Sequence, residues 1–115
     1  MDYRIRAALT IIKTEFPASP DLRGLAAAAN LSVSHFQHLF KKEVGLSLKQ
    51  YFNGLKLEKA KFLLENTNMQ IKEIASAVNY SDYSHFISDF KRTFGLYPKK
   101  YRVIFHSSIP VNASK

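Results

Sequence analysis

Two stretches of this 115-residue chain carry polar and basic side chains at the spacing of one helix face. In each stretch hydroxyl, amide, imidazole and cationic groups recur three or four residues apart, so a helix would gather them on one side. Such groups can hydrogen-bond to base edges in a DNA groove, and the cations can neutralise phosphates. They are Ser34, Gln37, His38, Lys41 and Lys42 in the first stretch, and Ser84, His85, Ser88, Lys91 and Arg92 in the second.

Both stretches lie inside an internal duplication. Residues 34–51 read SHFQHLFKKEVGLSLKQY, and residues 84–101 read SHFISDFKRTFGLYPKKY. Ser, His, Phe, Lys, Gly and Tyr recur in register at a spacing of fifty, and an upstream Ala, Ala, Asn pattern recurs at a spacing of 49. Two related supersecondary units are therefore predicted, rather than a solenoid.

Helices must position these side chains, and the apolar spacing is helical over almost the whole chain. No long segment keeps the apolar and polar alternation of a half-buried strand, so the predicted fold class is all-α. The predicted helices cover residues 3–16, 22–29, 33–44, 48–65, 71–78 and 83–94.

Each predicted unit consists of a short helix, a tight turn and a second helix. In the first unit Asp21 and Ser32 are suited to cap the two helices, and Asn30 is suited to close the first helix in a left-handed conformation. Asp82 is the expected N-cap in the second unit. A glycine ends the second helix of each unit, and Gly45 is expected to be left-handed.

The duplication predicts a division of the chain into four segments. We expect a first helix-turn-helix subdomain at 1–47, a linker helix at 48–66, a second helix-turn-helix subdomain at 67–105, and a flexible tail at 106–115. A helix of the linker's length would be a rigid connector between the two subdomains.

The composition favours an anionic partner. Seventeen Lys and Arg against nine Asp and Glu give a formal net charge of +8, which suits nucleic acid or an acidic membrane. Cysteine is absent, which excludes disulfides and thiolate metal sites and fits a reducing compartment. No apolar run approaches the roughly 18 residues of a membrane span, and the N-terminus lacks a signal-peptide pattern. We expect a cytoplasmic, nucleoid-associated protein without a membrane partner.

Five phenylalanines at helical spacing are predicted to form the core rather than a platform for stacked bases. These are Phe36, Phe40, Phe86, Phe90 and Phe94. His35 and His85 recur in register at the border of the polar face, and both packing or capping and DNA contact stay open for them. His35 and His38 could share a helix side as metal ligands, but without an obvious third ligand we expect no metal and no cofactor.

A short helix, a tight turn and an amphipathic helix form the arrangement that enters a DNA major groove. Side chains near the start of the second helix would reach bases, and those further along would meet the phosphate backbone. Two such helices on a stiff linker could enter successive major grooves, ~34 Å apart. One chain could then bind as a monomer where a dimer is usually required.

At these residues the chain resembles the AraC family of bacterial transcription regulators. The resemblance lies in LAAAANLSVSHFQHLFKKEVG and in residues 71–102, above all in IASAVNYSDYSHF, FKRTFG and YPKKYR. It implies a DNA-binding domain of about seven helices, with two helix-turn-helix subdomains joined by a long helix, on an asymmetric promoter site. It also implies transcription regulation, often activation through contact with RNA polymerase.

The resemblance also implies which side chains meet DNA. Base reading falls on Ser34, Gln37 and His38 in the first recognition helix, and on Tyr83, Ser84, His85 and Ser88 in the second. Phosphate contact is expected from Lys41, Lys42, Lys91, Arg92 and Arg102. Some relatives have Trp and Arg where this chain has Ser34 and His38, and Asn30 and Asn79 replace the usual turn glycine, so the target sequence stays open.

Nothing in the sequence indicates an enzyme, since it has no phosphate-cradling Gly loop, nucleophile motif or carboxylate cluster. The alternative is a cationic protein that binds nucleic acid non-specifically or lies on a membrane surface, using Lys56, Lys59 and Lys61. No sensor module is recognised. The chain is therefore either a complete small regulator or the C-terminal part of a longer one, and only the second would have a small-molecule effector.

Overall fold

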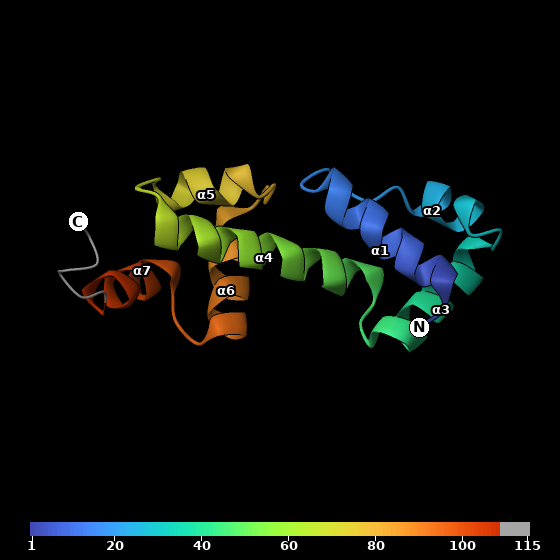
Figure 1. Ribbon diagram of the computed structural model, residues 1–115. Coiled ribbons are helices and arrows are strands. Elements are labelled where there is room, and N and C mark those ends of the chain that lie inside the picture. Colours follow the sequence, from blue (N-terminus) through green and yellow to red (C-terminus); the bar gives the residue numbers. More distant parts are fainter. Residues whose placement is uncertain (109–115) are drawn as a thin grey trace. The chain divides into compact units, whose positions relative to one another are not determined.

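The computed structural model describes residues 1–108, which contain seven helices and no strand (Figure 1). The helices are α1 (Tyr3–Glu15), α2 (Leu22–Ala28), α3 (Val33–Val44), α4 (Leu48–Asn66), α5 (Ile71–Ala77), α6 (Tyr83–Phe94) and α7 (Pro98–Ser107). The predicted all-α fold class is confirmed. Helices α3 and α6 have the bounds that the sequence pattern predicts.

The chain divides into two compact units, which we call the N-terminal unit (Met1–Leu55) and the C-terminal unit (Lys56–Lys115, described through residue 108). The division falls inside α4, so this helix serves both cores. Phe52 belongs to the core of the N-terminal unit, whereas Leu57 and Leu64 belong to that of the C-terminal unit. The segment expected to be a linker is thus also a packing element of each unit.

Side-chain caps begin the helices of both helix-turn-helix motifs. Asp21, Ser32 and Asp82 each accept a hydrogen bond from the backbone N–H three residues further on, at 3.1 Å. These bonds satisfy donors that have no partner within the helix, and a cap of this kind contributes about 1 kcal/mol. The predicted caps are therefore confirmed.

The tight turns and helix ends use left-handed backbone. Asn30 and Asn79 have φ values of 61° and 68°, and Gly45 and Gly95 have φ values of 87° and 83°. Asparagine tolerates this region better than most side chains, so it can stand where glycine is more usual. The two turns therefore retain their geometry despite the substitution of asparagine for glycine.

Each unit buries one apolar core. The core of the N-terminal unit comprises Ile5, Ala8, Ile12, Leu25, Ala26, Ala29, Phe36, Phe40 and Phe52. The core of the C-terminal unit comprises Leu57, Ala60, Leu64, Ile74, Ala75, Val78, Phe86 and Phe90. Phe94 is half-buried against the second core, so all five phenylalanines predicted to be apolar core residues pack as expected.

Helix α7 extends into the segment predicted to be a tail. His106 and Ser107 are helical, and the ring Nε2 of His106 lies 3.2 Å from the carbonyl oxygen of Glu65. Phe105 stacks on Tyr101 with ring centroids 6.1 Å apart. These contacts anchor the helix end, so the ordered chain runs further than the sequence suggested. Residues 109–115 of the predicted tail lie outside the described residues.

Candidate nucleic-acid interface

Helix α3 exposes every polar side chain that was predicted to contact DNA from the N-terminal unit. Its buried side holds Phe36 and Phe40, so the opposite side faces solvent. A hollow of about 620 Å³ lies between this polar side and the start of α4. Its lining residues are Gln37, His38, Lys41, Lys42, Ser47, Leu48 and Lys49. Two predicted base-reading residues and two predicted phosphate-binding residues are therefore brought together.

Two residues of this hollow, Ser47 and Lys49, were missed by the sequence analysis. Ser47 Oγ accepts from the N–H of Gln50 at 3.1 Å, and Gln50 Oε1 accepts from the N–H of Ser47 at 3.0 Å. This reciprocal pair fixes the start of α4 and holds Lys49 beside α3. A cation in the first turn of a helix supplements the positive end of the helix dipole, which favours an anion. The signal was available, because Lys49 recurs as Lys99 in the duplication.

Helix α6 exposes the corresponding side chains of the C-terminal unit. They are Tyr83, Ser84, His85, Ser88, Lys91 and Arg92. The ammonium of Lys72 on α5 lies 5.6 Å from the ring centroid of Tyr83, which ties the start of α6 to the preceding helix. The ammonium of Lys91 donates to the carbonyl of Gly95 at 3.2 Å and lies 5.1 Å from the ring of Tyr97. Lys91 therefore also stabilises the end of its own helix.

A buried carboxylate on α6 joins three of its neighbours. Asp89 is only 4% exposed, and its Oδ2 accepts from the Tyr80 hydroxyl at 2.9 Å. The His85 Nε2 lies 3.3 Å from the same oxygen, while the guanidinium of Arg92 donates to Oδ1. Burial, and then the hydrogen bond to Asp89, raises the pKa of Tyr80, so its hydroxyl stays a donor. We call these four residues the Asp89 cluster.

The Asp89 cluster bears on the two histidines whose roles were left open. His85 belongs to the cluster and also lies edge-on to Tyr80, with ring centroids 5.8 Å apart. His35, its counterpart in α3, is exposed, and its backbone N–H donates to the Ser32 cap. His85 thus has a local structural partner, and contact of either imidazole with DNA stays a prediction.

Arg102 is placed differently from the other predicted phosphate contacts. Its guanidinium donates to the carbonyls of Leu64, Met69 and Thr67 at 3.1, 2.6 and 3.2 Å. These carbonyls lie at the end of α4 and in the following loop, where helix geometry leaves acceptors without intrahelical partners. Since three of its bonds serve the backbone of its own unit, we assign Arg102 a structural role and remove it from the phosphate-binding set.

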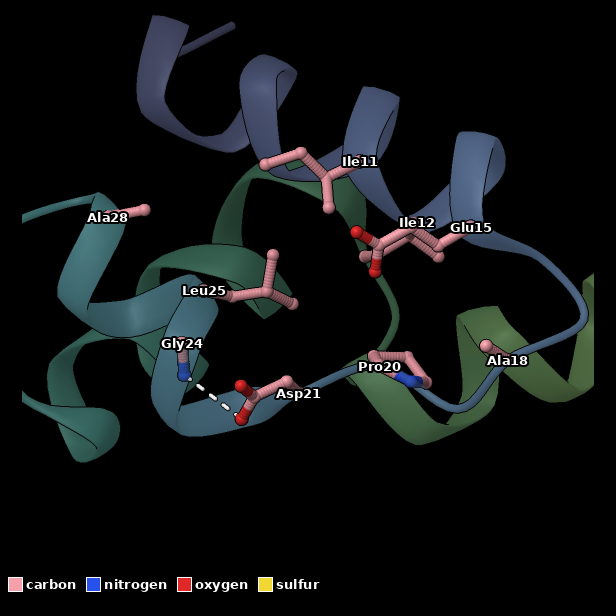
Figure 2. Close-up of a pocket in the computed structure, with 9 residues that line it drawn as sticks. All are labelled: Ile11, Ile12, Glu15, Ala18, Pro20, Asp21, Gly24, Leu25 and Ala28. Carbon is pink, nitrogen blue, oxygen red and sulfur yellow. Dashed lines mark hydrogen bonds between the residues drawn. The ribbon is translucent and has the colours of Figure 1, made fainter.

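A separate cavity of about 200 Å³ lies between α1 and α2 (Figure 2). It is lined by Ile11, Ile12, Glu15, Ala18, Pro20, Asp21, Gly24, Leu25 and Ala28. Its charged groups are the carboxylates of Glu15 and Asp21, and Figure 2 shows Asp21 bonded to the Gly24 N–H. Two negative charges would repel phosphate, so this cavity is not part of the basic face that α3 presents.

No helix within residues 1–108 has the length and apolar character required to cross a membrane. Exposed polar and basic side chains suited to an anionic partner lie on α3 and the start of α4 in the N-terminal unit, and on α6 in the C-terminal unit. Hydroxyl, amide and imidazole groups lie at the start and middle of the two longer motif helices, and cations lie in their last turns. This is the order in which base edges and backbone phosphates are met by a helix in a groove.

Comparison with known proteins shows the family to which this fold belongs. A protein family described as "Helix-turn-helix domain" matches residues 25–103. The Msm operon regulatory protein of Streptococcus mutans serotype c is 35% identical over 92 residues, which are 80% of this chain and 33% of that protein. The solved C-terminal domain of the two-component response regulator yesN from Fusobacterium nucleatum is 32% identical, with a TM-score of 0.73, covering 84% of this chain and 95% of that domain.

The chain belongs to this helix-turn-helix family and to its AraC type, as the sequence resemblance predicted. The DNA-binding domain of AdpA, solved in complex with a target DNA, has the same fold, with a TM-score of 0.82 at 21% identity over 94% of this chain and 97% of that one. The chain spans about a third or less of the length of the curated relatives that it matches first.

Proposed function

We propose that this chain is the DNA-binding part of a transcription regulator and that α3 and α6 are its two recognition helices. The observation that carries the proposal is the duplicated motif, in which each recognition helix buries its phenylalanines and exposes a row of base-reading and phosphate-binding side chains. The family supports it, and a protein of the same fold has been solved on a target DNA.

In the N-terminal unit, Ser34, Gln37 and His38 read bases, and Lys41 and Lys42 bind phosphates. Glutamine can bond bidentately to adenine, while imidazole and hydroxyl groups donate to or accept from several base edges. The two lysines lie in the last turn of α3, beside Lys49 across the hollow. Their three ammonium groups provide a positive rim for the backbone at the edge of the groove.

In the C-terminal unit, Tyr83, Ser84, His85 and Ser88 read bases, while Lys91 and Arg92 bind phosphates. The positions that correspond to Gln37 and His38 are occupied by Ile87 and Ser88, of which Ile87 packs against the core. The two units therefore present different donors and acceptors. A single chain would then require two different DNA boxes, and its site would be asymmetric.

Selection from randomised duplex DNA tests this function. The purified chain is incubated with the pool at near-physiological salt, and the bound sequences are determined. We expect an asymmetric motif with two boxes about one helical turn apart. One enriched box would limit base reading to one unit. Binding without enrichment that collapses as salt rises would instead identify a non-specific cationic protein, and preference for anionic vesicles over duplex at matched salt would favour a membrane surface.

Substitutions separate the two kinds of contact. Gln37→Ala or His38→Ala should change base preference in one box, at a cost of ~1–3 kcal/mol per lost base contact. Lys41→Ala should weaken binding to all sequences and reduce the salt dependence. Exposed Lys13 on α1 offers a control with the same change in charge, and Lys13→Ala should do neither. An unchanged base preference in both α3 variants would refute their assignment.

Three further features belong to the whole regulator. We propose that it acts on transcription, as an activator, through contact with RNA polymerase, and that it is associated with the nucleoid. A small-molecule effector is expected only if the chain continues into a sensor domain. A reporter placed behind the selected site tests the sign of regulation: increased transcription supports activation, and decreased transcription identifies a repressor.

A further inference from the structure

The Asp89 cluster places a buried negative charge on the helix that is proposed to enter a negatively charged groove. A carboxylate there weakens the attraction of the helix to DNA, because like charges repel and a buried charge is poorly screened by salt. Its presence therefore suggests another task. Its side chain is 5% exposed, while the side chains of His85 and Arg92, which it holds, are 60% and 72% exposed. The charge is therefore hidden beneath two groups that reach solvent.

The helix-turn-helix motif does not itself require a carboxylate at this position. Fifty residues earlier, the duplicated position is Leu39, which is half-buried against the core of the N-terminal unit. Leucine at this position is therefore compatible with a helix of the same length that has a side-chain N-cap, a left-handed Asn in the turn and a left-handed Gly at its end. Replacing a buried charged group by a well-packed apolar one is often neutral or stabilising. A carboxylate at position 89 thus calls for a role other than packing.

We propose that Asp89 is a positioning residue for DNA recognition by the C-terminal unit, which fixes the Arg92 guanidinium and the His85 imidazole in the orientations that meet DNA. This inference rests on the proposed function. One oxygen of Asp89 accepts from Arg92, and the other is shared by Tyr80 and His85. Two exposed and flexible side chains are thereby tied to one rigid point.

The advantage of this arrangement is preorganisation. Arginine presents five donors in a planar fork, so a bond from one nitrogen to Asp89 leaves donors for a phosphate and sets their direction. Side chains that are already ordered lose less conformational freedom on binding. The Tyr80 hydroxyl completes the cluster from the turn before α6, while Arg92 and His85 hold the carboxylate from α6 itself.

The test compares two variants that differ only at position 89. Tyr80→Phe removes the hydroxyl and leaves Asp89 with its two partners on α6, Arg92 and His85. Tyr80→Phe combined with Asp89→Leu reproduces the leucine of the N-terminal unit and leaves no tyrosine hydroxyl unpaired. Both variants are compared with the parent by thermal unfolding and by titration with the selected duplex and with a scrambled duplex of equal length.

We expect Tyr80→Phe to bind the selected duplex like the parent, and the double variant to bind it about tenfold more weakly. The double variant is one unit more positive than the parent, whose formal net charge is +8, so its binding to scrambled DNA should strengthen slightly. The positioning role requires that the double variant lose affinity for the selected duplex but not for scrambled DNA, although its added positive charge favours both, and that it keep the melting temperature of the parent. Equal or tighter binding of the selected duplex by the double variant overturns the proposal.

A double-mutant cycle identifies the side chains through which Asp89 acts. In a background carrying Tyr80→Phe, His85→Ala and Arg92→Ala there is nothing left to position, so adding Asp89→Leu should change affinity for the selected duplex less than twofold. A tenfold loss that persists in this background would assign Asp89 to general folding of α6 and refute the positioning role. If the parent enriches no sequence, the proposed function itself is refuted. If the parent selects DNA and the Asp89 variant retains the same selection, only the positioning role is refuted.

Discussion

The N-terminal and C-terminal units share a duplicated sequence, and two of the packed positions at which they differ exchange an apolar for a charged side chain. At the first, Leu39 packs against an apolar core, whereas Asp89 is hydrogen-bonded in a polar cluster. At the second, Phe52 is buried beside Phe16, with ring centroids 5.7 Å apart, whereas Arg102 bonds to three carbonyls. The same motif therefore tolerates either an apolar or a charged side chain at equivalent positions.

The features that the two units keep show which part of the motif is indispensable. The Phe40–Tyr51 pair has ring centroids 5.9 Å apart, and the Phe90–Tyr101 pair has them 5.8 Å apart. The N-caps and the left-handed turn and end residues are also retained in both units. The aromatic pair and the helix ends set the geometry of the motif, while the flanking interior positions adapt to what each unit packs against.

Truncation at position 52 should produce the largest effect and confine it to one unit. Phe52→Ala should lower the free energy of unfolding by about 3–5 kcal/mol, because it leaves a cavity in the core of the N-terminal unit. Amide hydrogen exchange, which resolves the two units, measures the loss. Phe62→Ala in the same helix is the control, since Phe62 is 52% exposed. Equal loss of protection in both units would contradict the confinement of the effect to the N-terminal unit.

Arg102→Ala should have the next largest effect, on the C-terminal unit. Three carbonyls would lose a charged donor, and partial replacement by water limits the destabilisation to about 2–3 kcal/mol. Chemical denaturation combined with hydrogen exchange at the end of α4 measures it, and exposed Lys100→Ala is the matched control. Undiminished stability with weaker DNA binding would restore Arg102 to the phosphate-binding set.

Alanine at the two helix-ending glycines should affect the two units alike. Gly45 and Gly95 have positive φ values, and nothing lies within 4 Å of a Cβ added at either. Only backbone strain opposes the substitution, so each variant should lose roughly 1 kcal/mol. Thermal unfolding of Gly45→Ala and Gly95→Ala measures the pair. A much larger loss in one unit would mean that its helix end has a role besides turning the chain.

The local features of the fold were predictable from sequence because short-range chemistry determines them. The bounds of α3 and α6, the caps at Ser32 and Asp82, and the left-handed Asn30 follow from residues within one helical turn. The exposed rows on α3 and α6 follow equally from helical periodicity. These features comprise most of the candidate interface.

Features that depend on contacts distant in sequence were not predictable in this way. Arg102 looks like a phosphate contact until the carbonyls 33 to 38 residues before it are located. The sequence pattern indicated no role for Asp89. Its partner Tyr80 lies before α6, and the burial of Asp89 depends on the packing of the whole C-terminal unit. The hollow itself arises from how the start of α4 packs beside α3, although the recurrence of Lys49 as Lys99 could have drawn attention to that side chain.

Alkaline pH should reveal the smallest difference between the units, through Tyr101. Burial, followed by its hydrogen bond to Glu65, raises the pKa of Tyr101 to about 12, above the ordinary value of about 10. Between these values the folded chain binds more protons than the unfolded one, so the stabilisation from this group is complete below about pH 10 and is lost as the pH rises toward 12.

Hydrogen exchange is too fast in this range, so urea denaturation at about pH 9 and about pH 11 provides the measurement. Tyr101→Phe cannot ionise and should show a shallower decline than the parent. Lysine titration is common to both proteins and cancels in the comparison, so equal declines would show that Tyr101 is ionised as readily in the folded C-terminal unit as in the unfolded chain.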